Sequence, residues 1–221
     1  MPKKRKEAGS RKVEKKIYIL CEGADKHSEY AYLDALIKDT PIKGDKVKIE
    51  LAPTKYNTGR ELVMEASKKI DRKFKDIDEA WVVYDQDGYT LHKETFEMAK
   101  QKNVKIAFSA TAFEFWILLH FEYTTKHFSK SEDIIQELKD KKFIDYAKNS
   151  KDVYSLTKEK LPNAKQNAGK IRIEVEKYDG DKKVYKRNPY TNLDLLIEEI
   201  QNPDFENDNG MYLASFWKDF Y

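Results

Sequence analysis

The chain has 221 residues, of which 37% are charged and 40% hydrophobic, and its formal net charge is +3. This length suits one large domain, or a core domain with an appendage. The sequence contains no apolar run of about 18 residues, which argues against a membrane-spanning helix. Its single cysteine, Cys21, excludes an internal disulfide and a multi-cysteine zinc site. The first residues also lack the apolar stretch of a secretory signal. We therefore expect a reducing, cytoplasmic setting without membrane association.

The positive charge is concentrated at the start of the chain. Residues 1–16 hold eight Lys or Arg and two Glu, so the rest of the chain is net acidic. Basic arms of this kind bind nucleic-acid phosphates by releasing counterions. We predict a disordered basic arm over residues 1–15, in which Lys3, Lys4, Arg5 and Lys6 are candidate nucleic-acid contacts. The alternative is a solvated tail that only aids solubility.

The first half of the chain alternates between strand and helix patterns. Short apolar runs predict strands, apolar residues at helical spacing predict helices, and Thr58 with Glu61 forms a capping-box pattern at a helix start. The predicted strands are 16–21, 47–51, 80–85 and 105–109, and the predicted helices cover about 26–38, the segment that starts after Thr58, and about 91–101. Four alternations of strand and helix indicate an α/β fold with a mostly parallel four-stranded sheet.

The second half has a different pattern. Residues 113–121 are too apolar for a surface element, and a buried helix is favoured over a strand because Ile117 is their only β-branched residue. Helical patterns follow at about 131–139, 152–160, 164–177 and 191–201, with Thr191 as the expected N-cap of the last. We predict a core over residues 16–125 and a helical C-terminal region, residues 126–221, packed on that core.

Three acidic residues follow predicted strands. Glu22 follows the first strand, and Asp85 and Asp87 follow the third. Ligands of parallel α/β sheets bind beyond the carboxyl ends of the strands. Neighbouring carboxylates repel one another unless a cation joins them, and Mg²⁺ or Mn²⁺ takes oxygen ligands. Glu22, Asp85 and Asp87 are therefore the candidate metal ligands. The alternative interpretation is that they form turns and cap helices.

Further candidates lie later in the chain. Glu114 and His120 are six residues apart, which is about 600° of rotation along a helix, so they do not share a face. We take Glu114 as an additional catalytic candidate and expect His120 to be a buried histidine with satisfied hydrogen bonds. Lys165 is a candidate phosphate contact, although surface lysines are usually only solvated.

Four blocks of the sequence, in this order, resemble the RloB-like family, and they span roughly residues 11–200. The blocks are YILCEGADKHSEYAYL, WVVYDQDG, IAFSATAFEFWILLHFE and NPYTNLDLL. The resemblance implies a Toprim-like fold with a metal-dependent nuclease core. It implies that Glu22 is the motif glutamate and that Asp85 and Asp87 are the DxD pair. It also implies a role in phage defence or abortive infection beside a partner ATPase encoded nearby.

The sequence departs from the family pattern at two places. Lys26-His27-Ser28-Glu29 stands where the family commonly has a Thr-Glu pair, and Ala110-Thr111 stands where it often has Asn-Pro. The first departure leaves Glu29 unassigned as a site residue.

Two other functions compete with a nuclease. A strand ending in Asp85-Gln86-Asp87-Gly88, with Ser109 after the next strand, is also similar to haloacid-dehalogenase-type phosphatases, in which the first aspartate is the nucleophile. The motif lies in mid-chain, however, and no later strand ends in a paired acidic motif. The second alternative is a non-catalytic module that binds nucleic acid or an ATPase. The sequence leaves open whether the substrate is RNA, such as tRNA, or DNA. It also leaves open whether the chain acts alone, with a partner or as a homo-oligomer.

Overall fold

A five-stranded, mostly parallel sheet forms the centre of the molecule. The computed structural model describes residues 15–22, 27–41, 47–70, 77–86 and 88–203. Within them the strand order is β2-β1-β3-β4-β5, and only β5 runs antiparallel to its neighbour. The strands are β1 (Lys15–Cys21), β2 (Val47–Ala52), β3 (Glu79–Asp85), β4 (Lys105–Ala110) and β5 (Tyr190–Thr191). The predicted α/β class is confirmed, but the predicted count of four strands is wrong.

The fifth strand comes from the C-terminal region, which is therefore not purely helical. Tyr190 pairs with Ala110, and Thr191 pairs with Ser109. The side chain of Asn192 continues this pairing, because its amide accepts from Phe108 N at 2.7 Å and donates to Ile106 O at 2.8 Å. A two-residue strand has no alternating pattern of its own, so no local pattern predicts it.

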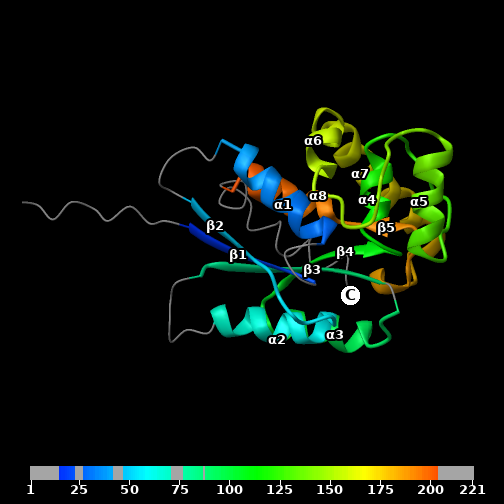
Figure 1. Ribbon diagram of the computed structural model, residues 1–221. Helices are drawn as coiled ribbons and strands as arrows, with labels where there is room; N and C mark the ends of the chain where they lie inside the picture. Colours follow the sequence, from blue (N-terminus) through cyan, green and yellow to red (C-terminus); the bar gives the residue numbers. More distant parts are fainter. Residues whose placement is uncertain (1–14, 23–26, 42–46, 71–76, 87, 204–221) are drawn as a thin grey trace, which may run out of the picture.

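Helices cover both faces of the sheet (Figure 1). On one face lie α2 and α3, and on the other lie α1, α8 and the remaining helices. The bounds are α1 (Ser28–Asp39), α2 (Gly59–Ile70), α3 (His92–Lys102), α4 (Glu114–Leu119), α5 (Ser131–Asp140), α6 (Val153–Thr157), α7 (Leu161–Asp179) and α8 (Leu193–Gln201), with two short 3₁₀ turns at Lys158–Lys160 and Val184–Lys186. None of the described helices is long and apolar enough to cross a membrane.

Most of the helix boundaries agree with the sequence patterns. The capping box at the start of α2 is confirmed, since Glu61 N donates to Thr58 Oγ1 at 3.3 Å and Thr58 Oγ1 donates to Glu61 Oε2 at 2.8 Å. The apolar run near residue 115 does form a fully buried helix, α4. The prediction for α8 was wrong in detail, because its N-cap is Asn192 and Thr191 belongs to β5.

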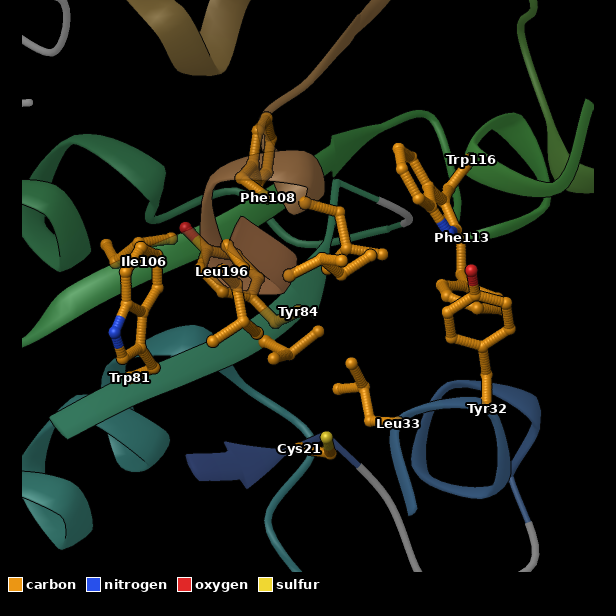
Figure 2. Close-up of a cluster of buried hydrophobic side chains, with 14 of the residues drawn as sticks. Cys21, Tyr32, Leu33, Trp81, Tyr84, Ile106, Phe108, Phe113, Trp116 and Leu196 are labelled. Atoms are coloured by element: carbon orange, nitrogen blue, oxygen red, sulfur yellow. The ribbon is translucent and has the colours of Figure 1, made fainter. Parts of the chain in front are cut away.

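A continuous apolar core joins the sheet to α1, α4 and α8 (Figure 2). Strand β3 is buried along nearly its whole length, as expected for a central parallel strand. Trp81, Tyr84 and Phe108 extend from the sheet, and Tyr32, Phe113 and Trp116 meet beside it. This packing fixes where β1 and β3 end, and therefore where the acidic residues after them lie.

Candidate active site

Glu22 and Asp85 lie side by side at the carboxyl ends of adjacent strands. Glu22 N continues the ladder beyond β1 by donating to Val83 O at 2.9 Å. The Glu22 carboxylate then accepts from Asp85 N at 3.4 Å. The two residues are 63 positions apart in the sequence, and the parallel pairing of β1 with β3 brings them together. Asp87, the third predicted ligand, lies outside the described residues.

Asp85 also contacts the start of α4. Its Oδ2 accepts from Phe113 N at 2.8 Å, and Phe113 directly precedes α4. Asp85 therefore makes a structural contact, and the choice between a structural role and metal binding stays a prediction. The same contact sets the start of α4, whose first residue, Glu114, faces the same region.

A cavity of about 430 Å³ opens beside these residues. Glu22, Glu29, Asp85 and Glu114 all line it, so α1, β3, α4 and the residue directly after β1 each contribute one carboxylate. The remaining lining residues are His27, Thr54, Lys55, Asn57, Val83, Tyr84, Ala112, Ser131 and Lys148. The cavity therefore combines an acidic wall with polar and basic residues from surrounding loops.

Burial and the charges of neighbouring carboxylates raise the pKa values in this cavity. Burial raises the pKa of Asp85 well above its ordinary value, and the charges of Glu29 and Glu114 raise it further. Burial likewise raises the pKa of Glu29 to about 7, with Glu114 and Glu22 adding to the effect. Burial also raises the pKa of Glu114, against the 3.0 Å hydrogen bond that it accepts from Tyr146. The carboxylates are thus close enough for their charges to oppose one another's ionisation.

The donor atoms suit a hard divalent cation, since all four side chains offer carboxylate oxygens. The described residues do not complete a ligand set by themselves: no three His, Cys, Asp or Glu side chains among them are grouped closely enough to hold a metal ion. Glu22 and Asp85 are the described pair nearest to such a set. The residue types fit a magnesium or manganese site, and Asp87 would be its third ligand.

A comparison with known families identifies the family of this chain. A family model described as RloB-like protein matches residues 17–200, a range that runs from β1 into α8. The chain belongs to the RloB-like family. The resemblance that the sequence blocks indicated is therefore confirmed. No curated protein and no solved structure matches the chain.

Other predicted residues of this RloB-like chain lie elsewhere. Lys165 on α7 pairs with Glu198 on α8 and donates to Gln201 at 3.1 Å. It lines a second cavity, of about 920 Å³, which shares no lining residue with the first. The structure therefore does not bring Lys165 to the carboxylates. The basic-arm candidates Lys3, Lys4, Arg5 and Lys6 lie outside the described residues.

His120 is a buried structural residue, as the sequence analysis favoured. It is fully buried, its Nδ1 lies 3.0 Å from Trp116 O, and its Nε2 lies 3.0 Å from Tyr32 Oη. Because a carbonyl can only accept, Nδ1 carries the proton and Nε2 accepts from the tyrosine.

Ser109 is the residue on which the phosphatase interpretation depends. It is buried in β4, and its hydroxyl lies 3.0 Å from Thr191 Oγ1. It does not line the acidic cavity. Its contacts are those of a residue that joins β4 to β5.

Sequence reasoning missed several residues of the cavity in this RloB-like chain. Glu29 was left unassigned, and Lys148, Lys55 and His27 were not considered. Glu29 offered one signal, because it lies in the first family block, near the start of the helix predicted after the first strand. Lys148 offered none, since its loop has no motif and reaches the cavity only through tertiary contacts.

Proposed function

We propose that this chain is a metal-dependent nuclease with a Toprim-like core, and that it hydrolyses the phosphodiester bonds of RNA, with tRNA as one candidate, or of DNA. The observation that carries the proposal is the convergence of Glu22, Asp85 and Glu114 on one cavity at the carboxyl ends of β1 and β3. Carboxylates that line one cavity repel one another, and a divalent cation bound between them offsets this repulsion.

The residues divide the chemistry between them. Glu22, Asp85 and Asp87 would hold Mg²⁺ or Mn²⁺, which when bound polarises a phosphate oxygen and stabilises the negative charge of the transition state. Phe113 N fixes one oxygen of Asp85 and so orients the carboxylate. Tyr146 orients Glu114 in the same way. Glu22 is alternatively the general base that takes a proton from the attacking water.

The wider role follows from family membership. We propose that the protein takes part in antiviral defence beside a partner ATPase, and that the basic arm adds affinity for nucleic acid. The cytoplasmic setting and a homo-oligomeric state remain predictions.

The direct test is cleavage of labelled RNA, tRNA and DNA by the purified protein with Mg²⁺, with Mn²⁺ or with EDTA. We expect metal-dependent cleavage that Asp85→Asn and Glu22→Gln each reduce by at least about 100-fold, since each variant removes charge at the reacting phosphate. Asp34→Asn is the matched control, because Asp34 pairs with Lys38 on α1 and does not line the cavity.

A metal-binding measurement tests the site even if the protein needs a partner before it cleaves its substrate. Mn²⁺ binding followed by electron paramagnetic resonance should be present in the wild type and in Asp34→Asn, and absent in Asp85→Asn. Cleavage that persists in Asp85→Asn, or a wild type that neither cleaves nor binds Mn²⁺, contradicts the proposal.

A further inference from the structure

Lys148 is a basic residue that lines the acidic cavity. It lies in the loop between α5 and α6, and Glu22, Glu29, Asp85 and Glu114 line the same cavity. Its side chain is exposed to solvent. Lys148 is therefore accessible to a substrate that enters the cavity from solution.

Hydrogen bonds on both sides of Lys148 hold its loop against the site. Tyr146, two residues before it, is buried and lies 3.0 Å from both Ser28 Oγ and Glu114 Oε1. Asn149, the next residue, donates its backbone N–H to the same Ser28 hydroxyl at 2.9 Å. Ser28 is the first residue of α1, so the loop is fastened to α1 and, through Glu114, to α4.

Lys148 acts electrostatically on two of the carboxylates but forms no ion pair with any of them within the described residues. No ion pair joins it to any carboxylate among the residues that the structure describes. Its positive charge nevertheless opposes the rise that burial causes in the pKa of Glu29 and of Glu114. An ammonium group close to an acidic wall, but not paired with it, is free to meet an anion.

A phosphodiester is itself an anion, and the four carboxylates repel it. Mobile solvent cations screen this repulsion only weakly inside a cavity. A substrate phosphate that approaches Asp85 therefore needs a fixed positive group on its other side, and lysine is a common phosphate contact.

We infer that Lys148 binds the substrate phosphate at the mouth of the cavity, and that Ser28 and Tyr146 are positioning residues that hold its loop there. This inference rests on the proposed function for the identity of the ligand as a nucleic-acid phosphate. It adds the group that receives the phosphate before any metal acts on it.

The test is binding of a fluorescent single-stranded oligonucleotide in EDTA, where no metal-dependent cleavage occurs, over a series of salt concentrations. Lys148→Met should weaken binding about fivefold and lower the slope of log K against log salt by about 0.7, the value for one lost phosphate contact. Lys148→Arg should keep most of the affinity. Lys151→Met is the matched control, because Lys151 is exposed three residues further on and does not line the cavity.

Tyr146→Phe tests the positioning role. It leaves Lys148 in place but removes the hydroxyl that lies between Ser28 and Glu114. We expect a loss of affinity smaller than that of Lys148→Met, with the salt slope unchanged because the charge remains. Wild-type affinity in Tyr146→Phe contradicts the positioning role. A wild type that does not bind, or a Lys148→Met variant that matches Lys151→Met in affinity and slope, overturns the phosphate contact.

Cleavage assays separate this inference from the proposed function. If Asp85→Asn is inactive while Lys148→Met binds and cleaves as Lys151→Met does, the nuclease stands and the role of Lys148 falls. If Lys148→Met loses the phosphate contact but no form of the protein cleaves or binds Mn²⁺, the contact stands and the nuclease falls.

Discussion

The two ends of the sheet each bury acidic residues, but they treat the negative charge differently. At the amino ends of the strands, Glu79 contacts Lys105 at 2.8 Å and Lys15 at 3.3 Å, and Lys15 also pairs with Glu199 on α8. Two lysines therefore face two glutamates. Trp81 completes the cluster by donating its indole N–H to Glu79. Every carboxylate in it has a cation from the chain itself.

At the carboxyl ends, four carboxylates line one cavity, and no ion pair joins Glu29, Asp85 or Glu114 to a lysine of the described residues. Their hydrogen bonds come from neutral donors, as with Phe113 N to Asp85 and the hydroxyl of Tyr146 to Glu114. The amino-end cluster therefore carries its own cations, whereas Glu29, Asp85 and Glu114 have no ion pair within the described part of the chain. Paired charge of the first kind stabilises the fold, and carboxylates of the second kind favour a cation from outside.

The largest expected effect comes from breaking the paired cluster. Lys105→Met keeps the length of the side chain but removes the ammonium group that contacts Glu79, and both residues are buried. Leaving a buried carboxylate short of its partner should lower the free energy of unfolding by about 3 kcal/mol. Urea denaturation followed by circular dichroism measures this loss.

The matched control for that change is Lys102→Met, at the exposed end of α3. It removes the same charge from the surface and should change stability by less than about 0.5 kcal/mol. Equal stability of Lys105→Met and Lys102→Met would show that the amino-end cluster contributes no more than a surface charge, and the comparison between the two ends would lose its basis.

Only some residues of the acidic cavity could be predicted from the sequence. Glu22 and Asp85 could be found because each directly follows an apolar strand, and parallel strands end at one edge. Glu29 and Lys148 could not be placed, because what brings them to the cavity is tertiary. The contact between Ser28 and Tyr146 spans 118 positions and depends on how α1 packs beside α4. The strand β5 was missed for a similar reason, since two residues and the Asn192 amide form it only against β4.

A smaller effect tests the burial of His120, which is fully shielded from solvent. Burial lowers the pKa of His120 from 6.5 to about 4. The folded protein therefore binds fewer protons than the unfolded chain between these values. The resulting contribution to stability is complete above pH 6.5 and is lost as the pH falls towards 4, by about 2 kcal/mol at pH 5.

The comparison for His120 is a series of urea denaturations between pH 7 and pH 4. His120→Gln removes the titrating group and should flatten this part of the stability profile. His127→Gln replaces an exposed histidine and serves as the control. A wild-type profile that His120→Gln leaves unchanged would mean that His120 is not held neutral by burial.

The smallest expected effect has the opposite sign from the first. Asp85→Asn removes one of the mutually repelling charges, and the asparagine carbonyl can still accept from Phe113 N. Without divalent metal, the variant should therefore be more stable than the wild type, by about 1 kcal/mol. Thermal unfolding in EDTA measures this gain, with Asp34→Asn as the control because Asp34 is ion-paired with Lys38.

Adding Mg²⁺ or Mn²⁺ should reverse that order. A ligand that binds only the folded state stabilises it by about 2.7 kcal/mol at 100 times its dissociation constant, and Asp85→Asn would lose this stabilisation. If Asp85→Asn is instead less stable than the wild type in EDTA, the Asp85 carboxylate stabilises the folded protein, as the Glu79 carboxylate does. If the wild type is less stable than Asp85→Asn in EDTA and more stable with metal, the carboxyl-end cluster binds a cation. If the wild type is the more stable protein in both conditions, the Asp85 carboxylate stabilises the fold by itself.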